Sequence, residues 1–173
     1  MLLTTLLVVA TLAGTPAHAS KSDPGEVSDR VRAIDKSSTR LLLDGLHESP
    51  TIASEVNRLM HSDVVVYITT GPNLKLTGQL TFMTHAGGLT YVLIRVHPML
   101  TGIDRLVALG HELQHACEIA DADGQVTDER TLAALYQKIG FQTGPQAFES
   151  AGAQAASASV RREVWNAIRT GGM

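Results

Sequence analysis

The sequence contains a single cysteine, Cys117, so no disulfide can form within the chain. Stability must therefore come from side-chain packing, with a bound metal ion as a further source. Basic residues are not in excess either, because the formal net charge is -3, and the chain offers no broad positive surface for nucleic acid. Beyond the first residues there is no apolar run long enough to cross a membrane.

The first residues have the pattern of a secretory signal peptide. Residues 2–13 are apolar and uncharged, and Ala17-His18-Ala19 follows as a small-x-small cleavage site. The run is too short for a spanning helix, and no basic residue precedes it, which leaves a buried N-terminal helix as the alternative. We interpret residues 1–19 as a signal peptide, so the mature protein is expected in the periplasm or outside the cell.

The remainder is predicted to form one α+β domain over residues 37–173, preceded by a flexible polar arm over residues 20–36. The Gly87-Gly88 pair predicts a hairpin turn, so we expect a small antiparallel sheet packed against helices. Helical spacing, β-branched runs and capping residues predict, in chain order, helices over 40–47 and 50–60, strands over 64–68, 79–85 and 89–97, and helices over 102–120, 128–139 and 144–169.

The helix predicted over residues 102–120 carries the sequence His111-Glu112-Leu113-Gln114-His115. Histidines four positions apart lie one helical turn apart on the same face, so both imidazoles can reach one Zn²⁺ ion. Glu112 is rotated away from that line, beside the ion and not on it. Leucines and alanines of the helix form an opposite apolar stripe, which predicts that the histidines face a cleft.

This arrangement predicts hydrolytic chemistry. Zn²⁺ lowers the pKa of its bound water towards about 7 and polarises a substrate carbonyl. Glu112 would accept the proton of the attacking water as general base and pass it to the leaving amine. The alternative is a solvated helix face that carries these residue types by coincidence.

The segment Leu109-Gly110-His111-Glu112-Leu113-Gln114-His115-Ala116 resembles the active-site helix of zincin metallopeptidases. In that family an antiparallel strand along the substrate cleft precedes the helix, and Leu89–His97 stands in that position. The resemblance implies a minimal zincin-like core, a bound zinc ion, cleavage of peptide or protein substrates, and an extended substrate paired with the edge of that strand. The chain is also similar to small exported bacterial proteins that carry this helix.

A catalytic zinc usually has three protein ligands, and the third is not fixed by the helix. The metzincin pattern requires glycine at position 118 and a ligand at 121, whereas this chain has Glu118 and Asp121. The gluzincin pattern places a glutamate on a later helix, which favours Glu149 in the opening turn of the last helix. Asp121 remains the main alternative, with Glu129 and Glu163 as further ones, and Glu118 is expected to hydrogen-bond a ligand imidazole.

Other polar residues have simpler interpretations. Tyr136 could donate to an oxyanion, but its spacing with neighbouring leucines favours packing. Cys117 falls on the apolar stripe and is interpreted as a core residue. The competing function is a zinc-stabilised binding or structural module of the cell envelope without turnover. Substrate side-chain preference and oligomeric state are not encoded in any pattern of the sequence.

The signal-peptide interpretation predicts that the mature chain begins at Ser20. Mass spectrometry of the protein recovered from the exported fraction measures this directly. Detection of Met1 on exported protein would contradict the predicted cleavage.

Overall fold

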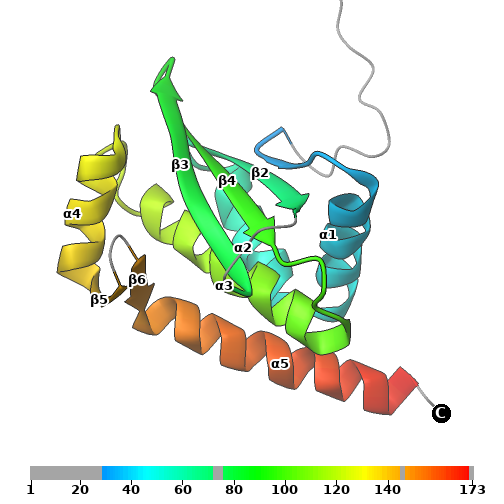
Figure 1. The fold of residues 1–173 in the computed structure, drawn as a ribbon. Helices are drawn as coiled ribbons and strands as arrows, with labels where there is room; N and C mark the ends of the chain where they lie inside the picture. Colours follow the sequence, from blue (N-terminus) through cyan, green and yellow to red (C-terminus); the bar gives the residue numbers. More distant parts are fainter. Residues whose placement is uncertain (1–28, 72–75, 145–146, 172–173) are drawn as a thin grey trace, which may run out of the picture.

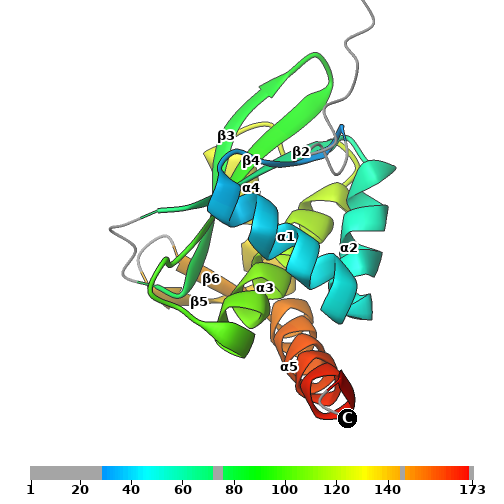
Figure 2. The same cartoon turned by 90° about the vertical axis from the view of Figure 1, so that its right-hand side faces the viewer.

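The computed structural model describes residues 29–71, 76–144 and 147–171, and the chain alternates between helices and short strands (Figures 1 and 2). The elements in chain order are β1 (Val31–Ala33), α1 (Lys36–Glu48), α2 (Pro50–Met60), β2 (Val64–Thr70), β3 (Gly78–Ala86), β4 (Leu89–Val96), α3 (Gly102–Ala120), α4 (Glu129–Ile139), β5 (Gly140–Gly144), β6 (Ala147–Ser150) and α5 (Ala151–Gly171). The predicted α+β class is confirmed, and the predicted signal peptide lies outside the described residues.

The main sheet is mixed, with strand order β1-β2-β4-β3. The predicted hairpin is present, because β3 and β4 pair antiparallel through Gly87 and Gly88, whose φ angles are 60° and 75°. However, β1, β2 and β4 run parallel to one another, so the expectation of a purely antiparallel sheet was wrong. The consecutive buried residues Val64, Val65 and Val66 of β2 are typical of a strand in a parallel arrangement, which is covered on both faces.

Part of the predicted polar arm is a strand. Residues 31–33 form β1, which pairs parallel with β2 in a register that sets Val31 opposite Val66. The arm prediction was therefore wrong for residues 29–36, and its other residues, 20–28, lie outside the described part. Within β1 only Val31 is fully buried, so the polar composition of the surrounding segment concealed the strand.

The helix α1 begins at Lys36, four residues before the predicted start, because Asp35 caps it. The Asp35 carboxylate accepts hydrogen bonds from the Ser38 backbone and from the Thr69 hydroxyl, which ties α1 to the end of β2. Burial acts to raise the pKa of Asp35, but these hydrogen bonds outweigh it and lower the pKa to about 2. The next helix, α2, begins at the predicted residue, with Ser49 as its cap and Pro50 at its first position.

The helix α3 lies between the sheet and α5, and it is buried over most of its circumference. The sequence predicted one buried stripe with the histidines on the opposite side facing a cleft, but α5 packs on that side, where Ser157 contacts His111 and His115 is 6% exposed. Gly110 permits the close approach, since a Cβ atom there would lie 2.6 Å from Val160 Cγ2 of α5. Thr101, the residue before α3, makes no capping hydrogen bond through its side chain.

The segment after α4 differs most from the prediction. Residues 140–144 and 147–150 form the antiparallel hairpin β5–β6, and α5 starts only at Ala151, not at Gly144-Pro145. The helix α4 begins at Glu129, one residue after the predicted start, and is capped by Asp128, whose carboxylate accepts a hydrogen bond from the Thr131 backbone. Among the described residues no helix has both the length and the apolar character needed to span a membrane.

One buried carboxyl group in this fold lacks a partner. Glu55 of α2 is 3% exposed, and neither of its carboxyl oxygens has a hydrogen-bond partner in the structure. Burial raises the pKa of Glu55 to about 8, and this effect exceeds the opposing charge of Arg58. Glu55 is therefore protonated in the folded protein at pH 7.

We expect Glu55→Gln to remove a pH-dependent loss of stability. In the wild type the unfolded chain ionises Glu55 near pH 4.5 and the folded chain only near 8, so stability is present below 4.5 and is lost as the pH rises to 8. The variant should be more stable than wild type at pH 8 by about 3 to 5 kcal/mol, and similar at pH 4. Denaturant unfolding between pH 4 and 9 measures this difference.

The exposed Glu129→Gln is the matched control and should show no such trend. A stability difference between Glu55→Gln and wild type that stays constant with pH would contradict a protonated Glu55.

Candidate metal centre

Three side chains from two elements converge beside α3. His111 and His115 lie one turn apart on this helix, and Glu149 lies on β6. Their potential ligand atoms are all within 4.8 Å of one another, so the cluster could hold a metal ion. The sequence placed Glu149 in the opening turn of the last helix; it is instead on the strand that precedes α5, opposite Phe141 of β5. The expected proximity to both imidazoles is present nonetheless.

The distances within the cluster suit a shared ion better than direct contact. The Oε1 atom of Glu149 lies 3.6 Å from His111 Nε2 and 3.9 Å from His115 Nε2. Both separations exceed a hydrogen bond. Two ligands bonded tetrahedrally to one Zn²⁺ ion would be about 3.3 Å apart, so only small side-chain shifts would bring these three atoms onto one ion.

Each imidazole is oriented by a hydrogen bond to its Nδ1 atom. His111 Nδ1 lies 3.0 Å from the Ser157 hydroxyl of α5, and His115 Nδ1 lies 2.9 Å from Glu118 Oε2. The two rings meet edge to face, with centroids 4.9 Å apart. Because the Nδ1 atoms are engaged, both Nε2 atoms are left for an ion on the Glu149 side.

The predicted hydrogen bond from Glu118 to a histidine of the motif is thus present, and it belongs to a larger network. The Ser150 hydroxyl donates to Glu118 Oε1 over 2.6 Å and accepts from the Ala153 backbone at the start of α5. Gly152 leaves room for this contact, since a Cβ there would lie 2.6 Å from Glu118 Oε1. Sequence reasoning missed Ser150, although a serine three residues before a helical N–H is a recognisable capping signal.

Glu112 lies outside the three-residue cluster, between α3 and β3. Its side chain contacts Gly78, where a Cβ atom would lie only 2.7 Å from Glu112 Oε1. Burial raises the pKa of Glu112 to about 7, although the charge of His115 and a hydrogen bond from the Leu80 backbone act in the opposite direction. Glu112 is thus only 6% exposed, and its carboxyl group titrates near neutrality.

The remaining groups of the cluster have unequal protonation. Burial lowers the pKa of His111, and the neighbouring His115 adds to that effect. Burial would also lower the pKa of His115, but the Glu118 hydrogen bond and nearby carboxylates outweigh it and raise the pKa. Burial acts to raise the pKa of Glu118, but its bonds to His115 and Ser150 lower it. Glu118 is therefore a buried carboxylate paired with the His115 ring.

The alternative third ligands lie away from the two histidines. Asp121 accepts two hydrogen bonds from Arg58, at 2.8 and 2.9 Å. Glu163 accepts from the Ser49 and Thr51 hydroxyls at the start of α2. Glu129 is exposed on α4. Among the described candidates, only Glu149 lies with both histidines.

Tyr136 packs beneath the site. Its hydroxyl donates to the His115 backbone oxygen over 3.2 Å, its ring lies edge-on to His115, and it stacks on Phe148. This supports the packing interpretation over an oxyanion donor. The buried Cys117 donates to the Glu55 backbone oxygen, as expected of a core residue.

The strand expected to offer its edge to a substrate does not have a free edge. Residues 89–96 form β4, which pairs with β2 on one side and β3 on the other, so that expectation was wrong. The terminal strand on this side of the described sheet is β3, which is also the strand that contacts Glu112 through Gly78.

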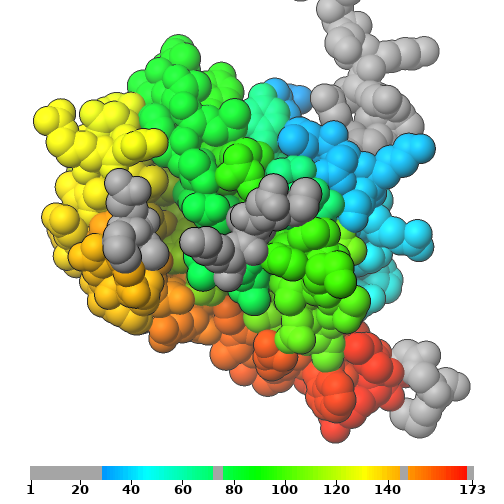
Figure 3. All heavy atoms as spheres, in the orientation of Figure 1, coloured from blue at the N-terminus to red at the C-terminus, as the bar shows by residue number. Residues whose placement is uncertain are grey.

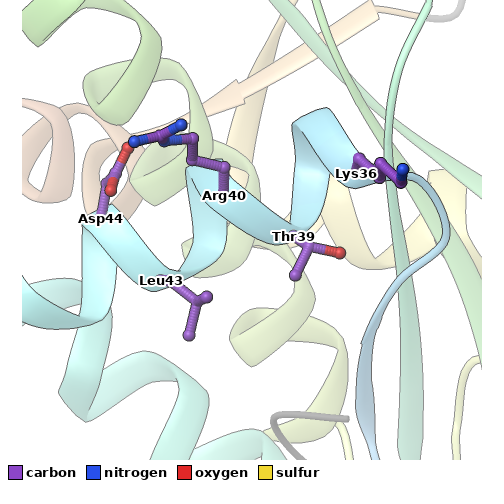
Figure 4. Close-up of a pocket in the computed structure, with 5 residues that line it drawn as sticks. All are labelled: Lys36, Thr39, Arg40, Leu43 and Asp44. Atoms are coloured by element: carbon purple, nitrogen blue, oxygen red, sulfur yellow. The ribbon is translucent and has the colours of Figure 1, made fainter. Parts of the chain in front are cut away.

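Two surface hollows lie away from the cluster. One is an open hollow of about 460 Å³ along α1, lined by Lys36, Thr39, Arg40, Leu43 and Asp44 (Figure 4). The other, of about 510 Å³, lies between the end of α2 and the turn after α3. Neither hollow is lined by His111, His115 or Glu149, so neither is part of the candidate metal centre.

Comparison with known proteins adds no assignment, since no family model, curated protein or solved structure matches this chain. The function must therefore be inferred from the residues and geometry of the site.

The cluster predicts that His115→Ala and Glu149→Ala each weaken binding of a divalent metal such as Zn²⁺ by about a hundredfold or more, because each removes one of three protein donors. Glu118→Gln should weaken it by about 10- to 100-fold, since it only orients His115. Isothermal titration calorimetry measures these affinities.

Asp121→Asn is the matched control for Glu149, since it alters a carboxylate bound to Arg58 away from the cluster. Unchanged affinity in both His115→Ala and Glu149→Ala would rule out the metal centre. The wild-type melting temperature should rise with added metal, because only the folded protein assembles the site.

Proposed function

We propose that this protein is a zinc-dependent hydrolase that cleaves peptide bonds, acting outside the cytoplasm after removal of residues 1–19. The observation that supports the proposal best is the position of Glu149 Oε1, 3.6 and 3.9 Å from the two imidazole nitrogens of the His-Glu-x-x-His helix. The helix supplies two donors and a general base from one turn, and β6 supplies the third donor from a different part of the chain.

The donor set favours zinc among the common metals. Two imidazoles with one carboxylate match the three-ligand sites of catalytic zinc, which leave one coordination position for water. Mg²⁺ and Ca²⁺ prefer oxygen donors throughout, and this cluster offers only one carboxylate. The side chains of His111 and Glu149 are 22% and 21% exposed, so a substrate can approach from their side.

When bound, zinc would polarise the substrate carbonyl and acidify a water molecule. The chain's own contribution is then proton transfer and orientation. Glu112, with a pKa near 7, can accept the proton of the attacking water at a carboxylate oxygen and donate it to the leaving amine. Glu118 and Ser157 hold the two imidazoles through their Nδ1 atoms, so neither ring has to reorient during the reaction.

An extended peptide is the substrate that best suits the neighbourhood of Glu112. The strand β3 is the terminal strand of the sheet and contacts Glu112 at Gly78. A peptide that adds to the outer edge of β3 would pass beside the general base and the cluster. The parallel strands, the antiparallel strand at the edge and the helix behind them support the zincin-like core that the sequence resemblance implies.

We expect Glu112→Gln to retain zinc and the fold while hydrolysis falls by about 10²- to 10⁴-fold, because the amide cannot accept the water proton. The measurement is cleavage of a broad peptide library by zinc-loaded protein, with zinc content determined in the same samples. Glu129→Gln, an exposed carboxylate on α4, is the matched control and should retain full activity.

If zinc-loaded wild type cleaves nothing in the library, the peptidase proposal fails. The zinc-stabilised module without turnover would then be the better interpretation. Equal cleavage by wild type and Glu112→Gln would instead show that another group is the base.

A further inference from the structure

The outer face of the last turns of α5 carries an unusual set of side chains. Trp165 and Ile168 are 56% and 54% exposed, although both are large and apolar. They lie at helical spacing with Arg161, Arg162 and Arg169, so these five residues share one side of the helix. We refer to them as the α5 stripe. Val160 and Val164, on an adjoining side of the helix, are buried.

The α5 stripe is positively charged within an acidic protein, since the whole chain has a formal charge of -3. Arg161 forms an ion pair with Asp104 of α3 at 2.9 Å. Arg162 and Arg169 hydrogen-bond to neutral side chains of their own helix, Ser159 and Asn166, so their charges are not neutralised there. The single acidic residue of α5, Glu163, points to the start of α2 instead.

The shape of this region is convex. The last turns of α5 extend past the rest of the body, where they form a ridge at one end of the molecule (Figures 1 and 3). Neither of the two surface hollows is lined by an α5 residue. A partner that recognises this ridge therefore needs complementary charge and an apolar layer, but no complementary pocket.

We propose that the α5 stripe binds the surface of a bilayer that contains anionic phospholipid. Tryptophan favours the boundary between headgroups and acyl chains, and arginine pairs with phosphate while its stem remains in the apolar layer. A helix with this composition lies in the plane of the interface without crossing it. A second copy of the chain is a poorer occupant, because stripe-to-stripe contact would bring the arginines of both copies together.

This attachment would hold the metal centre near the membrane without burying it. The cluster lies beside the N-terminal half of α5, since Ser157 contacts His111 and Glu149 lies two residues before the helix. From Ala151 to Trp165 the helix rises by about 20 Å. Because α5 would lie along the membrane, this rise separates the start of the helix from the stripe parallel to the surface, so the metal centre stays beside the bilayer. The binding surface itself does not depend on the proposed hydrolase activity.

The test uses the full chain and vesicles of phosphatidylcholine with or without 30% phosphatidylglycerol as the probe. Trp165 is the only tryptophan in the sequence, so its fluorescence reports the stripe alone. We expect a blue shift with the anionic vesicles, quenching by brominated lipid, and loss of both signals in high salt. The double variant Arg162→Gln/Arg169→Gln should bind about 25-fold more weakly, at about fivefold per arginine.

The matched control is Arg130→Gln on α4, whose side chain is 91% exposed, and it should bind as wild type does. If the full chain keeps the apolar residues 2–13, vesicle binding through them would neither shift the fluorescence of Trp165 nor respond to the arginine variants. The absence of a shift, or an equal shift with phosphatidylcholine alone, would overturn the proposal. So would a shift caused by polyglutamate and not by vesicles, or one that follows protein concentration without lipid.

Discussion

The close antiparallel packing of α3 against α5 is the contact on which the candidate site depends. Along this interface Asp104 meets Arg161, Gly110 meets Val160, His111 meets Ser157 and Glu118 meets Ser150. Glycines at 110 and 152 remove the side chains that would separate the two helices. Without this approach the outer side of α3 would face solvent, and its polar residues would form a solvated face. With it, the same residues become a buried and oriented cluster.

Burial of so many polar groups on one helix requires that each has a partner, because an unpaired buried carboxylate is costly. Glu118 meets this requirement with His115 and Ser150, and its lowered pKa shows that the ionised form is favoured. Glu112 has fewer partners, so burial raises its pKa to about 7, which suits a group that must exchange protons. Within one helix, therefore, one glutamate is held charged and the other is held near its titration point.

The spacing of residues in the sequence predicted which side chains form the cluster. It did not predict the strand pairings that bring them together. The separation of His111 and His115 by four positions and the Gly87-Gly88 turn depend on contacts between near neighbours, and both are present. The parallel pairing of β2 with β4 and the short strand β1 depend on distant segments, which no local periodicity reveals. The β5–β6 hairpin was missed for a further reason: its strands are short, and the Gly144-Pro145 signal is shared by turns and helix starts.

Glu149 shows why a residue could be predicted correctly from a mistaken local structure. The prediction required only that the chain reverse direction twice after α3 and bring a carboxylate back beside it. Glu149 meets this requirement whether it lies in the first turn of a helix or on a strand. The strand is the better support, because its pairing with Phe141 fixes the backbone at Glu149 and the Ser150–Glu118 hydrogen bond anchors the next residue to α3. Phe148 is held on the other side by stacking on Tyr136, whose hydroxyl bonds to the His115 backbone. Both neighbours of Glu149 are thus attached to the histidine helix, so its carboxylate is positioned by contacts that are independent of any ion.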